Sequence, residues 1–130
     1  MRVSTSVAYG LLAVGYIAQH KDERIILSDR VAEKYNIPLE YLLRIMQELV
    51  RRRILKSKRG PGGGFSLGRP LNKITMLEVV EAIDGPMDTP LGLEEHAARD
   101  RFATNVSKIY DKAVGQARSV LKKVKISDLL

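Results

Sequence analysis

The 130-residue sequence predicts a mainly α-helical fold with one small β-hairpin and a long C-terminal helix. Three observations support this prediction. Several segments carry apolar residues at intervals of three or four, which is the spacing of helices that pack on a core. Two short alternating segments flank the glycine-rich stretch 60–64, as the strands of a β-hairpin do. The last helical stripe, from residue 102 onward, is long and has no evident cover within the chain.

The segment from Ser4 to His20 is expected to form the first helix. Ser4, Thr5 and Ser6 favour a helix start, and apolar and small residues then surround the segment on nearly every side, which indicates a buried helix. Its apolar run, residues 7–18, is shorter than the roughly 18 to 20 residues that span a membrane. No small-residue cleavage site follows the run. We therefore expect neither a membrane anchor nor a signal peptide here.

A short turn separates the next two predicted helices. Residues 25–27 could form a short strand, after which we expect Ser28 to cap the second helix. Asn36 is expected to end that helix in a left-handed conformation, and Pro38 opens a third helix that runs to about Arg52. Two helices joined in this way form a helix-turn-helix unit. Taken alone the signal is weak, because many helical hairpins look similar.

The hairpin that follows sharpens this interpretation. Residues 54–59 and 65–67 alternate as strands do, and the stretch Gly60 to Gly64 between them cannot be helical. A hairpin directly after a helix-turn-helix unit is a wing. A fourth helix begins at Thr75, which we expect to form a capping box with Glu78. Residues 1–86 are thus predicted to form a winged helix-turn-helix domain.

Residues 87–130 are predicted to form a loop and a long dimerisation helix, from about Asp100 to Lys123. Because nothing else in the chain covers its apolar stripe, we expect a second copy of the chain to do so. The apolar tail 126–130 could dock on that partner. The predicted dimerisation residues are Phe102, Val106, Ile109, Ala113, Ala117, Val120 and Val124.

The charge distribution points to a polyanionic partner. The net charge is +7, and residues 49–77 contain eight Lys and Arg residues without one Asp or Glu. Residues 78–100, in contrast, carry seven acids and one base. A solvated charge run would explain three or four such charges, but eight focused on a glycine-tipped hairpin favour a phosphate backbone.

The third helix would then enter the major groove of DNA, with Glu40, Tyr41 and Arg44 near its exposed start. The wing would follow the adjacent minor groove, with Arg59 entering it. As alternatives, Tyr41 could pack on a neighbouring helix and Arg44 could pair with a glutamate. The predicted DNA-binding residues are Ser4, Thr5, Ser28, Pro38, Glu40, Tyr41, Arg44, Arg51, Lys56, Lys58, Arg59, Gly60, Pro61, Gly62 and Gly63.

Several chemical functions are disfavoured. The sequence has no cysteine, which excludes disulfides, thiolate zinc sites and cysteine-ligated iron–sulfur clusters and agrees with a reducing cytoplasm. The two histidines, His20 and His96, stand far apart. Gly64 is followed by a predicted strand rather than by the helix that a nucleotide-binding loop requires. We therefore expect no metal, no cofactor and no catalytic activity.

Four segments carry a family resemblance: M-R-V-S-T-S-V-A-Y-G, L-S-D-R-V-A-E-K-Y-N-I-P-L-E-Y-L, L-K-S-K-R-G-P-G-G-G-F-S-L and I-T-M-L-E-V-V-E-A-I-D-G. They resemble the IscR/NsrR/CymR family of bacterial winged helix-turn-helix transcription regulators, closely over residues 1–86 and in pattern only over the last helix. The resemblance implies a homodimeric repressor on a pseudo-palindromic operator. It also implies DNA contacts by Pro38, Glu40, Tyr41, Arg44, Arg59 and Gly60.

Two departures from that family matter. Leu43 stands where the cluster-binding regulator reads bases with a glutamate, so the resemblance does not give the operator sequence. The loop 88–101 lacks the three cysteines that hold an iron–sulfur cluster in many members, and His96 in that loop is expected to be a bystander. A small-molecule effector, a protein effector and constitutive repression stay open. So do two other functions, a protein-interaction module that kept the fold and an RNA-binding basic protein.

Overall fold

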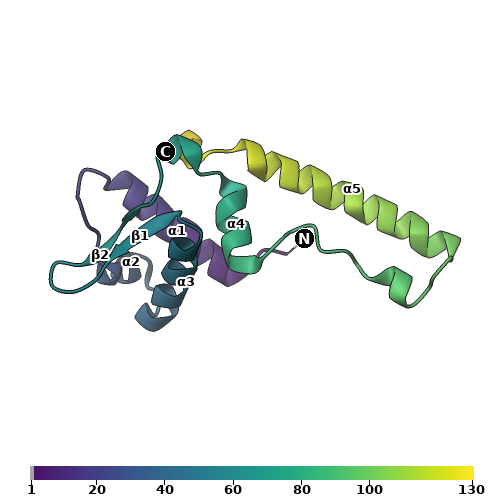
Figure 1. The fold of residues 1–130 in the computed structure, drawn as a ribbon, viewed down its shortest axis with the longest axis horizontal. Coiled ribbons are helices and arrows are strands. Elements are labelled where there is room, and N and C mark those ends of the chain that lie inside the picture. Colours follow the sequence, from purple (N-terminus) through teal and green to yellow (C-terminus); the bar gives the residue numbers. More distant parts are fainter. Residues whose placement is uncertain (1) are drawn as a thin grey trace.

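The computed structural model describes residues 2–130 and has the predicted architecture, a helix-turn-helix unit, a wing and a long final helix (Figure 1). The helices and strands are α1 (Thr5–Gln19), α2 (Ser28–Tyr35), α3 (Leu39–Arg51), β1 (Leu55–Lys58), β2 (Gly64–Leu67), α4 (Met76–Asp84) and α5 (Arg101–Lys123). Three short 3-10 helices complete it: η1 (Leu71–Lys73), η2 (Leu93–Glu95) and η3 (Ile126–Leu129). The predicted fold class is confirmed.

The turn between α2 and α3 forms as the sequence predicts. Asn36 adopts a left-handed conformation with φ 54°, and the backbone N–H of Ile37 donates to the carbonyl of Ala32 at 2.9 Å, which closes α2. The predicted cap at the other end of α2 is wrong. Leu27 is the N-cap and makes no side-chain capping bond, whereas Ser28 is already helical and nearly buried.

The wing is an antiparallel hairpin in which Leu55 pairs with Leu67 and Lys58 pairs with Gly64. Of the expected strand 25–27 only one bridge forms, between Ile26 and Phe65, whose N–H groups each donate to the other's carbonyl at 2.8 Å. This bridge fixes the chain before α2 against the edge of β2.

The core lies between α1, α2, α3, α4 and the inner face of the wing. Val14, Leu42 and Ile54 are completely buried within it. A Cβ atom on Gly10 of α1 would lie 2.2 Å from Cδ1 of Ile83 on α4. Glycine at this position therefore lets α1 and α4 approach closely.

Helix α4 begins with half of the predicted capping box. Thr75 Oγ1 accepts a hydrogen bond from the Glu78 N–H at 3.1 Å. The Glu78 carboxylate does not reach back to Thr75 but pairs with Arg69 at 2.6 Å. The reciprocal bond expected from the sequence is therefore wrong, because a nearby cation takes up the carboxylate.

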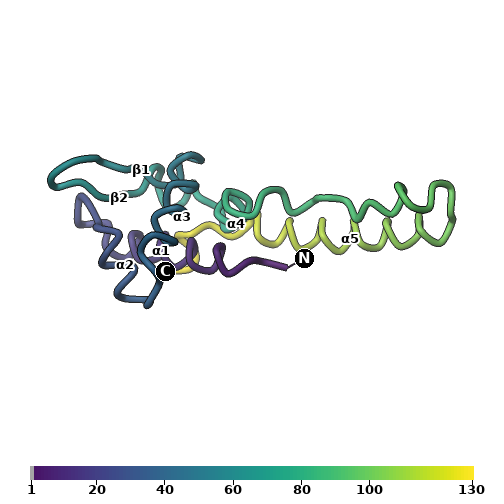
Figure 2. The backbone as a smooth tube through the Cα atoms, turned by 90° about the horizontal axis from the view of Figure 1, so that it is seen from below, coloured from purple at the N-terminus to yellow at the C-terminus, as the bar shows by residue number. Residues whose placement is uncertain are grey.

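Helix α5 projects away from the winged domain, and the loop that follows α4 runs outward beside it (Figures 1 and 2). Of the apolar tail 126–130, Ile126 packs inside its own chain, whereas Leu129 and Leu130 are each 58% exposed, so docking of the tail on a partner stays a prediction. Ile126 is buried in the core of its own domain, its N–H donates to the Ile74 carbonyl at 2.9 Å, and Met76 N–H donates to Val124 at 2.8 Å. Within residues 2–130, no helix combines the length and apolarity needed to cross a membrane.

Candidate nucleic-acid interface

Helix α3 presents a polar face to solvent. Glu40, Arg44, Gln47 and Arg51 are exposed, and their spacing of three or four places them on one side of the helix. The opposite side, including Leu42 and Leu49, is buried. Arginine and glutamine side chains can grip purine edges with paired hydrogen bonds. We had not selected Gln47 from the sequence, although its place outside the apolar stripe was visible there.

Tyr41 turns toward α1 rather than outward. Its hydroxyl shares a hydrogen bond with the hydroxyl of Ser6, and its ring meets the ring of Tyr9 edge-on at 5.7 Å between centroids. The Arg44 guanidinium lies 5.9 Å from the centre of the Tyr41 ring. Tyr41 therefore packs on α1, which is the alternative considered for it in the sequence. Its ring lies close enough to the Arg44 guanidinium for a cation–π interaction.

Glu48 forms an ion pair with Arg51 and not with Arg44, the arginine for which a glutamate partner was considered. The Glu48 carboxylate lies 3.4 Å from the Arg51 guanidinium. Because both side chains of this pair are exposed, the pair contributes little free energy. Arg51 can therefore exchange Glu48 for a phosphate at small cost.

The wing tip is exposed from Lys56 to Gly62. Gly60 and Gly62 have positive φ angles of 84° and 74°, and added Cβ atoms there would meet nothing within 4 Å. The turn therefore needs glycine for its backbone conformation, while the space beside it is open to another molecule. Arg59 at this tip makes no ion pair with any carboxylate among residues 2–130.

Arg69 is one of the eight Lys and Arg residues counted in the basic segment 49–77, but its guanidinium is engaged by groups of the protein itself. Its guanidinium donates to the carbonyls of Arg53 at 3.3 Å and Lys73 at 3.0 Å, and it pairs with Glu78. Arg53 itself is left-handed, with φ 62°. Arg69 therefore links Arg53 at the base of the wing to Lys73 of η1 and Glu78 of α4.

The remaining predicted phosphate donors lie near the helix starts. Pro38, the N-cap of α3, and Thr5 are exposed. The Ser4 hydroxyl donates to the Asp84 carboxylate, and the Ser4 N–H donates to the same group at 3.0 Å. Ser28 is nearly buried. Ser4 and Ser28 thus have little capacity left for a phosphate, whereas Thr5 and Pro38 are accessible.

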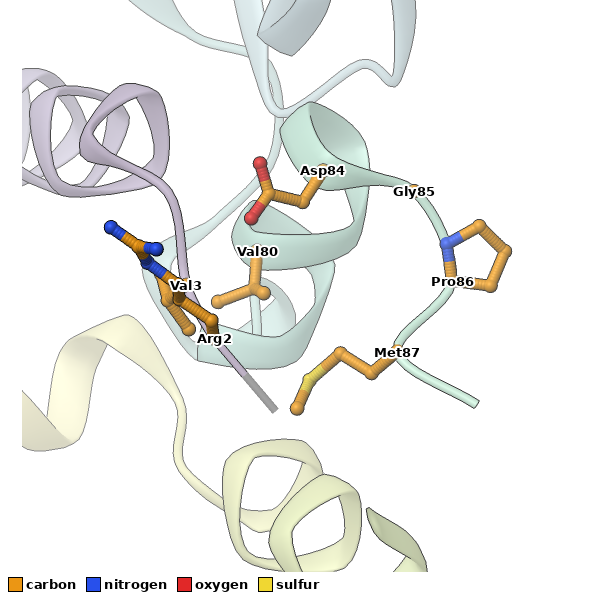
Figure 3. Close-up of a pocket in the computed structure, with 7 residues that line it drawn as sticks. All are labelled: Arg2, Val3, Val80, Asp84, Gly85, Pro86 and Met87. Carbon is orange, nitrogen blue, oxygen red and sulfur yellow. The ribbon is translucent and has the colours of Figure 1, made fainter. Parts of the chain in front are cut away.

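A cleft near the end of α4 lies beside Ser4. The side chains of Val80 and Met87 point toward the N-terminal segment at Arg2 and Val3 (Figure 3). Asp84 also lines this cleft, but its carboxylate is bound to Ser4. The cleft has no converging set of free polar groups in the described part of the chain, and we assign no ligand to it.

Comparison of the sequence with models of known protein families gives a result that agrees with a helix-turn-helix unit followed by a basic wing. The model of the Rrf2 family, described as "Iron-dependent Transcriptional regulator", matches residues 3–130. The chain belongs to the Rrf2 family. The Rrf2 chain is accordingly a DNA-binding transcriptional regulator, as the sequence predicts.

Individual relatives match the Rrf2 chain over its whole length. BadM of Rhodopseudomonas palustris, named as an HTH-type transcriptional regulator, is 33% identical over 131 residues that span 100% of the Rrf2 chain and 81% of BadM. An HTH-type regulator of Aquifex aeolicus is 30% identical over 133 residues, 100% of the Rrf2 chain and 92% of its own length. CymR of B. subtilis, titled its global cysteine regulator, superposes with a TM-score of 0.83 at 23% identity, over 99% of the Rrf2 chain and 95% of CymR.

The family description raises the question of whether the Rrf2 chain itself can hold iron. Its 130 residues include no cysteine. Within residues 2–130, no group of three His, Cys, Asp or Glu side chains is placed to hold a metal ion. His20 Nδ1 lies 2.7 Å from the Tyr16 carbonyl oxygen and its ring stacks on Tyr16, while His96 stands exposed at the end of η2. These residues do not fit a protein-held iron site, and we derive no iron-dependent step.

Proposed function

We propose that this Rrf2 regulator is a homodimeric repressor that binds a pseudo-palindromic operator in bacterial cytoplasm. The observation that carries the proposal is the outward face of α3, with Glu40, Arg44 and Gln47, together with Arg59 on the open wing tip, which makes no ion pair within residues 2–130. Helix α3 reads base edges in the major groove, and Arg59 enters the neighbouring minor groove. Lys56, Lys58 and Arg51 bind phosphates and fix the register.

The exposed stripe of α5 supports the homodimer. Phe102, Ile109 and Val120 are 76%, 69% and 62% exposed, and Val106, Ala113 and Ala117 continue the stripe at helical spacing. Val124, which the sequence predicts to be part of the stripe, is instead the extended C-cap of α5. A different side of the same helix, with Ala103 and Val114, is buried by the chain itself. Because monomers rarely expose a contiguous apolar stripe, we assign it to a second copy. Two copies would place their α3 helices about one DNA turn apart.

The proposal contains no cofactor and no catalytic step. Any effector, whether a small molecule or a protein, would act on the loop 87–100, which lies beside α5 and away from the wing (Figure 1). Such an effector would change DNA binding only by favouring one arrangement of the two α3 helices over another.

Selection of bound duplexes from a random DNA pool at about 150 mM salt tests the proposal. We expect enrichment of a palindrome with half-sites about one helical turn apart. The same selection with Arg44→Ala should relax the preference at one position of each half-site, whereas Arg101→Ala, at the far end of α5, should leave it unchanged. Recovery of unrelated duplexes with the unmodified protein would contradict sequence-specific binding. Repression is tested by placing the selected site over a promoter and measuring its transcription with and without the regulator.

A further inference from the structure

A hollow on the outer face of the wing collects positive charge from two parts of the chain. It is lined by Arg24, Ile25, Lys56, Ser57, Lys58 and Ser66. Lys56 and Lys58 come from β1, whereas Arg24 comes from the turn between α1 and α2. No carboxylate is among these lining residues. We infer that Arg24, Lys56 and Lys58 form a binding site for a DNA backbone phosphate, distinct from the contacts of α3 and of the wing tip.

The strand register places the two lysines on one face. Lys56 is the partner of Ser66 and Lys58 is the partner of Gly64, so these positions point to the same side of the hairpin. Leu55 and Phe65, on the alternate positions, are buried in the core. The lysines therefore face outward as a consequence of the core packing of their neighbours.

Backbone bonds bring Arg24 to the same face. The double hydrogen bond between Ile26 and Phe65 holds the preceding turn against β2. A Cβ atom on Gly64 would lie 2.5 Å from Cγ2 of Ile25, so glycine at this position permits the close approach. Arg24 thus stands beside the wing because the backbone places it there, and not through a flexible side-chain contact.

The charge of this site is unneutralised within the described chain. Arg24, Lys56 and Lys58 make no ion pair there. Glu23, the acid next to Arg24, is held by Arg30 at 2.6 Å, and the Arg30 hydrogen bond keeps the pKa of Glu23 below its ordinary value. Three like charges around one hollow repel each other, and the attraction of all three to a bound anion offsets that repulsion. The hydroxyl of Ser66, which the register places on the same side as the two lysines, can add a hydrogen bond to a phosphate oxygen.

Continuity with the wing tip identifies the anion as part of a DNA duplex. This step rests on the proposed function, which places Arg59 in a minor groove. Because a phosphate strand borders each side of that groove, a wing that enters it meets a strand on both of its faces. The inner face of the hairpin, with Leu55 and Phe65, packs on the core that includes α3, so the outer face carrying the hollow meets the strand farther from α3. The site therefore extends the footprint into the flanking DNA beyond each half-site.

The test is a salt series of binding measurements with Arg24→Ala on two operator duplexes. One duplex has long flanks, and the other ends at the minor-groove contact. On the long duplex we expect Arg24→Ala to weaken binding by about threefold to tenfold at 150 mM salt and to lower the salt slope by about one per protomer. On the short duplex we expect little change. Arg24→Lys should restore much of the affinity, and Arg101→Ala serves as a charge-matched control.

Unchanged affinity and slope for Arg24→Ala on the long duplex would overturn the site. An equal loss on both duplexes would overturn its place in the flank. In each of these cases the unmodified protein still binds the operator, so the proposed function survives. If the unmodified protein binds no duplex, the proposed function fails and this site fails with it. Circular dichroism of each variant separates a lost contact from a lost fold.

Discussion

The Glu81 carboxylate on α4 accepts two hydrogen bonds from the guanidinium of Arg118 on α5, each at 3.2 Å. It also accepts one from the Met87 N–H at 2.8 Å. One side chain therefore joins the long helix, the start of the loop 87–100 and α4, which itself packs on α3. Burial alone would raise the pKa of Glu81, but the bonds from Arg118 and Met87 outweigh it and hold the pKa below its ordinary value of 4.5.

This ion pair predicts a specific pH dependence of stability. Because the pKa of Glu81 is lower in the folded than in the unfolded protein, its contribution is full above about pH 4.5 and is lost as the pH falls through the lowered value. We expect Glu81→Gln to lower the Tm at pH 7, and the difference from the unmodified protein to shrink toward pH 3. Thermal melts between pH 3 and pH 7 measure this, with exposed Glu94→Gln as the control. A Tm difference that stays constant over the range would contradict the assigned pKa direction.

The wing assignment predicts unequal effects of two basic residues. Arg59→Ala removes the unpaired cation at the wing tip and should weaken operator binding by about 1 to 3 kcal/mol. Lys73→Ala, in η1, should change it little. Titration of a labelled operator with each variant measures both values, and equal losses would remove the role given to the wing.

The stripe on α5 predicts a dimer that one buried charge can break. Ile109→Asp places a carboxylate in the centre of the exposed apolar stripe, and burying it unpaired is unfavourable. We expect the unmodified protein to sediment as a dimer at micromolar concentration and Ile109→Asp to sediment as a monomer. Ser119→Asp adds the same charge to an exposed position outside the stripe and should leave the dimer intact. A monomeric unmodified protein would rule out the dimerisation role of α5.

The close approach of α1 and α4 predicts opposite effects at two glycines of one helix. At Gly10, an added methyl group would overlap Ile83 and approach Ile45 to 3.3 Å, so Gly10→Ala should destabilise the fold by about 1 to 3 kcal/mol. At Gly15, the added methyl meets only Gln19 Nε2, at 3.9 Å, and Gly15→Ala should stabilise α1 by about 0.5 to 1 kcal/mol. Urea unfolding of the two variants measures both changes. Stabilisation by Gly10→Ala would show that Ile83 moves aside easily.

The sequence predicts best those features that short-range chemistry determines. The left-handed Asn36 and the glycine turn of the wing follow from the conformational preferences of those residues. The Asp100 side chain caps α5 by accepting from the Phe102 N–H at 2.9 Å, close to the predicted helix start. Each of these features depends on residues within a few positions of each other.

The misses depend on contacts between distant residues. Whether Tyr41 faces DNA or α1 depends on Ser6, which lies 35 positions earlier. The Arg69 charge looks free in the sequence, but Glu78 and two backbone carbonyls surround it in the fold. Likewise, the apolar pattern of 126–130 does not show that Ile126 packs in the chain's own core. The outer-face hollow was also missed, because Arg24 precedes the basic block and meets it only through the Ile26–Phe65 bridge.

The burial of Ile126 in the core has a consequence for how the long helix is attached to the DNA-binding end. The chain leaves the winged domain at Gly85, the C-cap of α4, and returns at Lys125, which bridges Thr75, the N-cap of α4. The excursion 85–125 is thus anchored at both ends of a single nine-residue helix. This segment is therefore held to the winged domain at two points and not at one. Because α4 also packs on α3, a force on the far end of this segment would act on the helix that supports α3.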